Sequence, residues 1–532
     1  MLSRSASRAR PLVRSCQTTR HILHPQVSRR YQSGNSQKST TPWREEALPH
    51  ELDFGGHTMF SFRVLARFVR YSLIAAVGIA GTTLTAYEAT HMWIENIELA
   101  PEKNEEAKRW GWDLERDKWT GGDSGGTDPF LGFSNRHRVR AAWSAQNWGA
   151  GSDTAKVISS SSSKGSFGSG GLNVVETGLE YAQDFLRPVI DAAIAQESSG
   201  RLRPHTILDL LTRRADILER MGSRDGWFES RSEYERVWTR LAGQGPEAPR
   251  VALKLGDLNH RLGNSADALA WWSRAIQQSG GDVSPLNPLL PAVPSTPPSS
   301  PSSQRALASA FVSLSAFYAT TGQLRQAQTF QEASLNLLRS IRPPESFDKA
   351  SAPQALHALY LLHRSALITV HHAEVLYALR QPAATSVQWL TQAAESSERV
   401  ALLLTGLPAT HPDAPLSKIP HPPSSESPLL PIYKTSVSMQ KPAKSLLRDA
   451  RRSAAEAWNL VGILSEKSGD SRSLDTALQC YERALGWAGV AADTAGGIGQ
   501  AGEGILDAEW KALWANYVRV RDSVRSNSSE KP

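Results

Sequence analysis

The sequence predicts an all-α protein in which a solenoid of helical hairpins follows a single N-terminal transmembrane helix. Three observations lead to this prediction. Residues 71–87 form an uncharged apolar run, later stretches repeat apolar residues at helical spacing around turn glycines, and we read no strand of consequence. Hairpins with one apolar stripe must pack on their neighbours, so a stack of them reaches about 350 residues without one compact core.

Residues 1–32 have the composition of a mitochondrial presequence. No Asp or Glu occurs from Met1 to Arg44, and the segment is rich in Arg and Ser without the apolar core of a secretory signal. The stretch SRRYQS, in which Arg29 lies two residues before Tyr31, resembles a matrix-processing site of the Arg-x-Tyr type. We expect cleavage near Tyr31 or Gln32. A disordered basic tail is the alternative.

The basic character of the chain belongs to this leader. The formal net charge is +7, and seven presequence arginines account for it, at positions 4, 8, 10, 14, 20, 29 and 30. Nucleic-acid binding needs a clustered basic face, which the remaining chain lacks, so we predict no nucleic-acid partner. The two cysteines, Cys16 and Cys480, leave the processed chain without an internal disulfide.

The run at 71–87, YSLIAAVGIAGTTLTAY, predicts a transmembrane helix, because at ~1.5 Å per residue it is just long enough to cross a ~30 Å hydrocarbon core. A buried core helix is the alternative. The flanks differ in charge, with Arg63, Arg67 and Arg70 before the run and Glu88, Glu95 and Glu98 after it. Basic flanks stay on the side from which insertion starts. We therefore expect a single-pass mitochondrial inner-membrane protein, with segment 33–70 in the matrix and the C-terminal domain in the intermembrane space.

The membrane-proximal segment 88–171 is unusually rich in tryptophan and ends in a Gly/Ser tract at 159–171, which predicts a flexible linker. Three of its tryptophans, Trp110, Trp112 and Trp119, are interleaved with charges in RWGWDLERDKW. This pattern indicates a short amphipathic element with a large contact area. It either packs on the domain that follows or forms a docking surface for a membrane partner.

The clearest hairpin lies at 252–276. Leu255-Gly256 falls on one helix and Gly263 at the turn, and Ala268, Trp272 and Ala275 follow at i, i+4 and i+7. Small residues stand where two helices must approach closely. The pattern resembles the tetratricopeptide repeat (TPR), which has Leu-Gly, then a turn Gly, then Ala-x3-aromatic-x2-Ala.

Divergent copies of this pattern recur along a predicted domain at 172–521. The best has Trp458, Val461 and Gly462 on its first helix and Ala477, Tyr481 and Ala484 on its second. A helix at 505–520 is expected to cap the array, followed by a tail at 522–532. Two Pro/Ser-rich insertions, at 277–304 with seven prolines and at 406–442 with nine, are expected to be disordered.

No catalytic, cofactor or metal-binding motif is apparent. The stretch GDSGG at 122–126 copies the surroundings of the nucleophilic serine in trypsin-like proteases, but too few residues precede Ser124 to supply the histidine and aspartate of a triad. His371 and His372 are adjacent rather than at i, i+4, and CxxC, HExxH and Walker motifs are absent. We therefore predict a non-enzymatic protein with no cofactor, metal or small-molecule substrate.

Function in a helical solenoid lies in its concave groove, which the first helix of each pair lines and which binds segments of other proteins. Helix phase predicts seven groove residues, for which a solvated face is the alternative. They are Lys254, Asp257, Asn259, Arg261, Ser315, Tyr318 and Asn459.

The layout of presequence, membrane helix and divergent TPR domain resembles the fungal TPR adaptor subunits of the mitochondrial i-AAA protease. The resemblance implies an adaptor that binds unfolded or membrane proteins in the intermembrane space and delivers them to the protease, which supplies the zinc and ATP chemistry. Three alternatives remain open. They are an assembly factor for a respiratory-chain complex, an enzyme hidden in the Trp-rich segment, and an outer-membrane import receptor, which a cleavable presequence disfavours.

Overall fold

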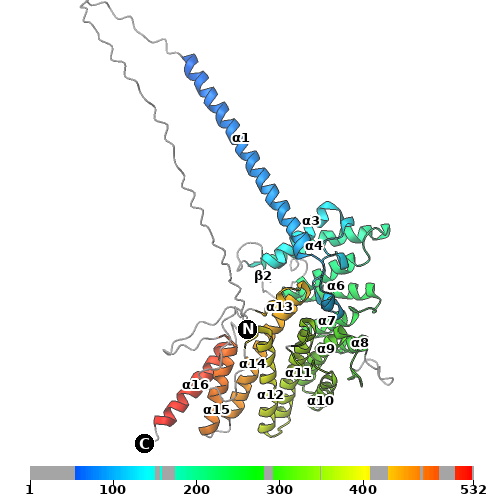
Figure 1. The fold of residues 1–532 in the computed structure, drawn as a ribbon, viewed down its shortest axis with the longest axis vertical. Coiled ribbons are helices and arrows are strands. Elements are labelled where there is room, and N and C mark those ends of the chain that lie inside the picture. Colours follow the sequence, from blue (N-terminus) through cyan, green and yellow to red (C-terminus); the bar gives the residue numbers. More distant parts are fainter. Residues whose placement is uncertain are drawn as a thin grey trace, which may run out of the picture. The chain divides into compact units, whose positions relative to one another are not determined.

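The computed structural model describes residues 54–149, 156–158, 174–280, 291–347, 349–407, 429–467, 471–489 and 510–529 (Figure 1). The fold is all-α, as predicted, apart from one antiparallel pair of three-residue strands, β1 (Lys156–Ile158) and β2 (Val174–Glu176). Lys156 pairs with Glu176 and Ile158 with Val174. The predicted presequence 1–32 and the Gly/Ser tract 159–171 lie outside the described residues.

Helix α1 (Phe54–Trp93) contains the predicted span 71–87. The chain divides into two units, 1–80 and 81–532, and α1 contributes to both. One candidate membrane span was found among the described residues, Thr58–Glu98, and its apolar window is not buried by protein. The helix extends beyond the apolar run at both ends, because basic and acidic side chains are compatible with helix outside the hydrocarbon. It ends in a π-helical turn, η1 (Ile94–Glu98).

The Trp-rich segment folds into short helical pieces followed by one long helix. These pieces are α2 (Glu105–Arg109) and the 3-10 turns η2 (Asp113–Glu115), η3 (Gly122–Ser124) and η4 (Pro129–Leu131). The side chain of Asn104 caps α2 by accepting hydrogen bonds from two backbone N–H groups. The long helix, α3 (Gly132–Trp148), was not predicted, and it packs on α4 (Thr177–Gln196).

Five helical pairs follow, and consecutive helices pack on one another. Figure 1 shows α11, α12, α14 and α15 lying side by side in this way. The pairs are α5 (Thr206–Arg220) with α6 (Arg224–Leu241), α7 (Ala248–Arg261) with α8 (Ser265–Gln278), α9 (Pro301–Thr320) with α10 (Leu324–Ser340), α11 (Ala352–Ala378) with α12 (Ala383–Thr405), and α14 (Val437–Glu466) with α15 (Ser471–Trp487). The last helix, α16 (Trp510–Ser529), packs on α15.

Close approach within a hairpin depends on glycine facing an aromatic ring. A Cβ atom on Gly256 of α7 would lie 2.4 Å from a carbon of Trp272 on α8, and one on Gly462 of α14 would lie 2.7 Å from Tyr481 on α15. Both contacts join residues that the sequence pattern aligned. Turn glycines such as Gly263, with φ of 89°, supply the left-handed backbone between the helices.

Helices extend into both predicted insertions and into the predicted tail, so these segments contain more helix than expected. The short helix α13 (Pro431–Lys434) and the start of α14 fall within 406–442, and Tyr433 and Met439 are buried there. Proline is tolerated at the first helical position, which Pro431 occupies. In the other insertion, α8 continues to Gln278 and α9 begins at Pro301, and α16 continues through the predicted tail to Ser529. Residues 281–290 and 408–428 lie outside the described residues.

Candidate functional site

The face formed by the first helix of each pair is occupied by the chain itself. Residues 102–119 of the Trp-rich segment, called the strap below, contact α5, α7, α9, α11 and α14. Each of these is the first helix of its pair. Sequence analysis placed the protein-binding groove on these helices, and the strap fills part of it.

Arg305, near the start of α9, is the centre of the strap contacts. Its side chain is 1% exposed and stacks on Trp112, with the guanidinium carbon 3.9 Å from the ring centroid. It donates to the carboxylate of Glu115 and to the carbonyls of Trp110 and Gly111, at 3.0 and 2.9 Å for the two carbonyls. A planar guanidinium with several fixed donors suits this arrangement, and lysine could not reproduce it.

His357 of α11 lies under the same guanidinium. Burial, with the nearby charge of Arg305, lowers the pKa of His357 to about 3. The imidazole is therefore neutral, and its Nδ1 accepts from Arg305 at 3.1 Å while Nε2 donates to Gln304 at 2.9 Å. The contacts of His357 are those of a packing residue.

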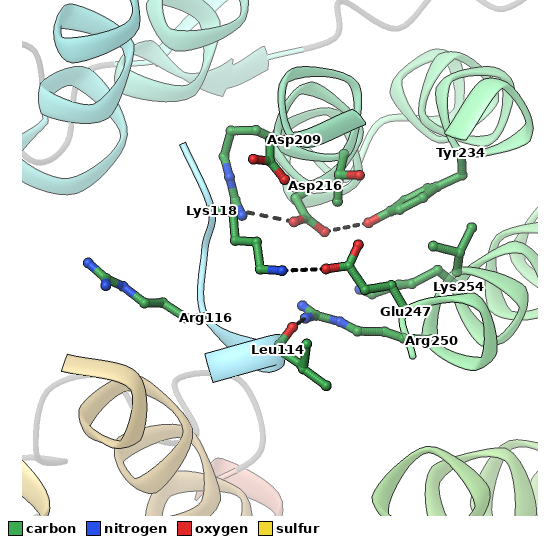
Figure 2. Close-up of a pocket in the computed structure, with 12 residues that line it drawn as sticks. Leu114, Arg116, Lys118, Asp209, Asp216, Tyr234, Glu247, Arg250 and Lys254 are labelled. Carbon is green, nitrogen blue, oxygen red and sulfur yellow. Dashed lines mark hydrogen bonds and ion pairs between the residues drawn. The ribbon is translucent and has the colours of Figure 1, made fainter. Parts of the chain in front are cut away.

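The strap's C-terminal end is held by α5, α7 and α14, as Figure 2 shows in part. Asp117 pairs with Arg213 of α5 at 3.0 Å and with Lys441 of α14. Although burial opposes ionisation, these two cations hold the pKa of Asp117 well below its usual range. The carbonyl of Leu114 accepts from Arg250 of α7 at 3.0 Å.

The strap's N-terminal end is tied to α14 through Glu102. One carboxylate oxygen accepts from the Ser438 backbone N–H at 2.9 Å and from the hydroxyls of Ser436 and Ser438 at 2.7 Å each. Burial raises the pKa of Glu102, but these hydrogen bonds outweigh it and lower the pKa to about 2. The charge also lies at the N-terminus of α14, where the helix dipole favours an anion.

A small cavity of about 40 Å³ lies between the strap and helices α5, α6 and α7 (Figure 2). Lys118 crosses it to pair with Glu247, and Tyr234 donates to Asp216. The buried Asp209 has one carboxylate oxygen without a partner among the described residues, and burial raises its pKa to about 7. The volume suits ordered water.

A second, larger polar cavity of about 540 Å³ lies beside the strap. Its lining comes from α5, α7, α11, α14 and the strap, with Gln146 of α3. Seven basic residues line it, Arg213, Arg220, Arg250, Lys254, Arg261, Arg364 and Lys441, against five acidic ones, Glu115, Asp117, Asp216, Glu219 and Asp449. Stripes at i, i+3 or i+4, and i+7 recur on these helices, so one face of each first helix is turned to the cavity.

Charge in this cavity is not fully compensated internally. Asp117 pairs with Arg213 and Lys441, and Glu219 pairs with Lys254 and Arg261. Within the part of the chain that the structure describes, three lining arginines form no ion pair, and they are Arg220, Arg250 and Arg364. The Nε atom of Arg364 is buried and has no partner among those residues. The cavity is therefore suited to negatively charged groups.

A further hollow of about 780 Å³ is lined mainly by α9, α10, α11 and the loop at 341–344. Leucine and proline side chains are prominent in it, with Trp110 of the strap and His357 at one edge. This hollow is less polar than the cavity beside the strap, and second helices, α10 and α12, contribute to its lining.

Of the seven predicted groove residues, Lys254 and Arg261 line the polar cavity. The others face neighbouring helices. Asp257 accepts from Trp272 at 2.9 Å and from Ser313 at 2.8 Å, and Asn259 is buried and donates to the Leu255 carbonyl.

Ser315 and Tyr318 of α9 are also buried, and Asn459 accepts from Asn516 of the capping helix α16. The predictions for Asn259, Ser315 and Tyr318 as groove contacts were therefore wrong. A first helix touches its own partner and the preceding and following pairs, so only a narrow stripe faces the groove, and helix phase alone did not locate that stripe.

Of the two alternatives for the three tryptophans, packing on the domain holds for two of them, and these two form no docking surface. Trp112 is fully buried and donates to the Pro353 carbonyl at 3.0 Å, and Trp119 is 4% exposed with Arg213 stacked on it. Trp110 is half-buried, packs near His357 at a ring distance of 5.3 Å, and edges the less polar hollow. The tryptophans hold the strap in place.

The arginines that define the site were not predicted from the sequence. Arg213, Arg250, Arg305 and Arg364 lie on four different first helices. The available signal was charge at helical spacing on one face of consecutive first helices, for example Arg213, Asp216 and Arg220 on α5. No protein-family model matches the chain, and no curated protein matches it.

Proposed function

We propose that this chain is a non-enzymatic, membrane-anchored adaptor that binds other proteins on the first-helix face of a TPR-like array. Helix α1 is the anchor, and the unit 81–532 carries the binding face. The finer placement follows the sequence, with a cleaved presequence, the mitochondrial inner membrane, and the domain in the intermembrane space. There the adaptor delivers unfolded or membrane proteins to the i-AAA protease.

One observation carries the protein-binding part of this proposal. The first-helix face already holds an irregular peptide segment, the strap, through backbone carbonyls, carboxylates and aromatic rings. Arg305 donates hydrogen bonds to two strap carbonyls, and Arg250 donates to a third. These are the interactions with which a groove holds any peptide chain. The remaining polar cavity offers a partner arginines that form no ion pair with the described residues.

The hairpin geometry supports a TPR-like array. Gly256 packs against Trp272 and Gly462 against Tyr481, in the Gly and aromatic positions of the repeat pattern. Ala268 and Ala275 are buried on the same side of α8 as Trp272. The second and the last pair of the array thus use the same small-to-large contact.

The polar character of the cavity favours one rival. Ion-paired surfaces select specific charged partners more readily than unfolded apolar chains. An assembly factor for a respiratory-chain complex, which binds defined subunits, is therefore the second candidate function.

The test is co-purification from mitochondria in mild detergent, with the recovered proteins identified by mass spectrometry. We expect an inner-membrane AAA metalloprotease with the wild-type chain, and slower turnover of its substrates on deletion. Recovery of respiratory-complex subunits without the protease would select the assembly factor. Recovery of no specific protein would contradict both.

Matched variants locate the binding face. The double variant Arg220→Gln/Arg364→Gln changes two arginines of the cavity that form no ion pair among the described residues. Arg452→Gln changes an exposed arginine of α14 outside the cavity lining. We expect partner recovery to fall several-fold for the double variant and to stay unchanged for Arg452→Gln. Equal recovery would move the binding face elsewhere.

A further inference from the structure

An exposed aromatic pair lies where the membrane helix meets the domain. Phe133, at the start of α3, is 72% exposed, the most exposed large apolar side chain among the described residues, and Phe130 on η4 is 57% exposed. Single exposed apolar residues are ordinary, but two bulky rings within four residues need an explanation.

Contacts place Phe133, and with it the start of α3, beside the part of α1 around Glu88. His137 of α3 lies 3.1 Å from the Glu88 carboxylate, and the ring of Phe133 is 4.1 Å from the His137 ring. About two turns further along the chain, in η1, Glu95 pairs with Arg136 at 2.9 Å and Arg140 at 3.1 Å. The N-terminal half of α3 is thus fixed to the end of α1 and to η1, between Glu88 and Glu95.

The part of α1 around Glu88 coincides with the end of the apolar run. Arg70 and Glu88 are the charges that bound the run, and 18 helical steps between them rise about 27 Å, close to the thickness of a hydrocarbon core. Glu88 then lies at the boundary between hydrocarbon and headgroups. The ring of Phe133 contacts His137, which in turn binds Glu88.

We propose that Phe130 and Phe133 insert into the lipid headgroup region beside α1 and dock the domain on the membrane surface. Bulky apolar rings at this depth gain burial in lipid, as amphipathic interfacial helices do. Trp93, half-exposed on α1 itself, lies at the same level along the helix. The exposed Arg138 on α3 adds a cation that can meet lipid phosphate. The docked face orients the groove relative to the bilayer, and the inference rests on the proposed membrane span of α1.

Site-specific quenching tests the proposal on the full chain in phosphatidylcholine liposomes. Phe130→Cys and Phe133→Cys are labelled with an environment-sensitive fluorophore, in a Cys16→Ser background where Cys480 remains buried at 5% exposure. Lipids that carry a spin label near the headgroup quench a docked probe, and aqueous iodide quenches a free one. We expect lipid quenching of both probes to exceed iodide quenching several-fold.

Two controls separate the outcomes. Phe228→Cys on α6 has the same 57% exposure as Phe130 and should be quenched by iodide only. Val77→Cys, near the middle of the apolar run of α1, should be quenched by lipids that carry the spin label on the acyl chain, and not by iodide. If Val77 is lipid-quenched while Phe133 behaves like Phe228, the docking proposal is overturned and the anchor stands. If Val77 is also quenched only by iodide, both the span and the docking fail.

A charge variant adds an independent readout. Phe133→Asp removes one ring of the pair and, because the side chain is exposed, should leave thermal stability within about 1 °C of the wild type. We expect lipid quenching of the Phe130→Cys probe to fall at least two-fold in this background. Unchanged quenching with Phe133→Asp would contradict insertion of the pair.

Discussion

The hairpin array and the strap are stabilised in opposite ways. Array contacts join neighbours in sequence, such as Gly256 and Trp272, and depend on small residues facing large apolar ones. Strap contacts join distant residues through charges and hydrogen bonds, such as Arg305 with Glu115 and Glu102 with Ser438. An array of this kind tolerates gradual change, repeat by repeat. The strap depends on a few buried polar groups, each of which leaves several partners unsatisfied if removed.

Among the proposed substitutions, Arg305→Met should lower the free energy of unfolding most, because it removes the central strap contact. It would leave the Glu115 carboxylate and two strap carbonyls without their donor in a buried site, and it would remove the cation stacked on Trp112. We expect a loss of about 3–5 kcal/mol in the free energy of unfolding, measured by denaturant titration in detergent.

The matched control is Arg274→Met on α8. Arg274 also stacks on a tryptophan, Trp271, at 4.4 Å, but it is exposed. Its replacement should cost less than about 1 kcal/mol. Similar losses for the two variants would show that the strap is not the more vulnerable region.

Trp112→Ala tests whether the strap tryptophans stabilise the fold from within or form a docking surface. The ring is fully buried and its N–H is bonded to Pro353, so truncation should cost about 3–5 kcal/mol. The same change at Trp148, which is 48% exposed, should cost much less. A docking surface would give the reverse pattern, with unchanged stability and lost partner binding.

The array could be predicted from the sequence because its register is local. Gly256, Trp272 and Ala275 lie within 20 residues of one another, so the repeat pattern contains the contact itself. Helices α3 and α4 were missed because neither carries the glycine and aromatic pattern. The predicted insertion at 406–442 was too long because proline content was taken as disorder, although Pro431 starts a helix and Tyr433 is buried.

The strap could not be predicted because its contacts span most of the chain. Arg305 meets residues about 190 positions away, and Glu102 meets Ser438 at a separation of 336. In sequence, Arg305 is one arginine near a helix start, and Trp112 is one of several tryptophans between charges. Only the fold shows that the first-helix face is covered by the segment that precedes the domain.

Asp209→Asn should change how the stability of the region beside the strap depends on pH. Burial raises the pKa of Asp209 from 3.8 to about 7. Stability from this group is fully present below its unfolded pKa of 3.8 and is lost as pH rises from there to about 7, because the unfolded chain then releases a proton that the buried carboxyl keeps. The Asn variant escapes this loss, so it should gain about 2–4 kcal/mol over the wild type between pH 4 and pH 8.

Glu102→Gln should change the pH dependence of stability in the opposite direction, because the pKa of Glu102 is lowered and not raised. The pKa of Glu102 is lowered to about 2, so its contribution is present above its unfolded pKa of 4.5 and is lost as pH falls through about 2. The Gln variant is therefore expected to be less stable than the wild type at pH 7, with a smaller difference at pH 3. Parallel pH profiles for the two variants would contradict the assigned environments.

Gly256→Ala makes the smallest change and tests the array side. Alanine favours helix over glycine by about 1 kcal/mol, which by itself would stabilise α7. The new Cβ, however, would lie 2.4 Å from the Trp272 ring, and overpacking of a rigid contact costs about 1–3 kcal/mol. We expect a net loss of about 1–2 kcal/mol in the free energy of unfolding, which disappears when Trp272 is replaced by Leu in a double-mutant cycle.

Because repeat contacts are local, the loss should appear as weakened hydrogen-exchange protection in α7 and α8, while α14 and α15 keep their protection. Uniform loss across all pairs would mean that strap and array unfold as one unit, and the contrast between the two regions would then hold for contacts but not for stability.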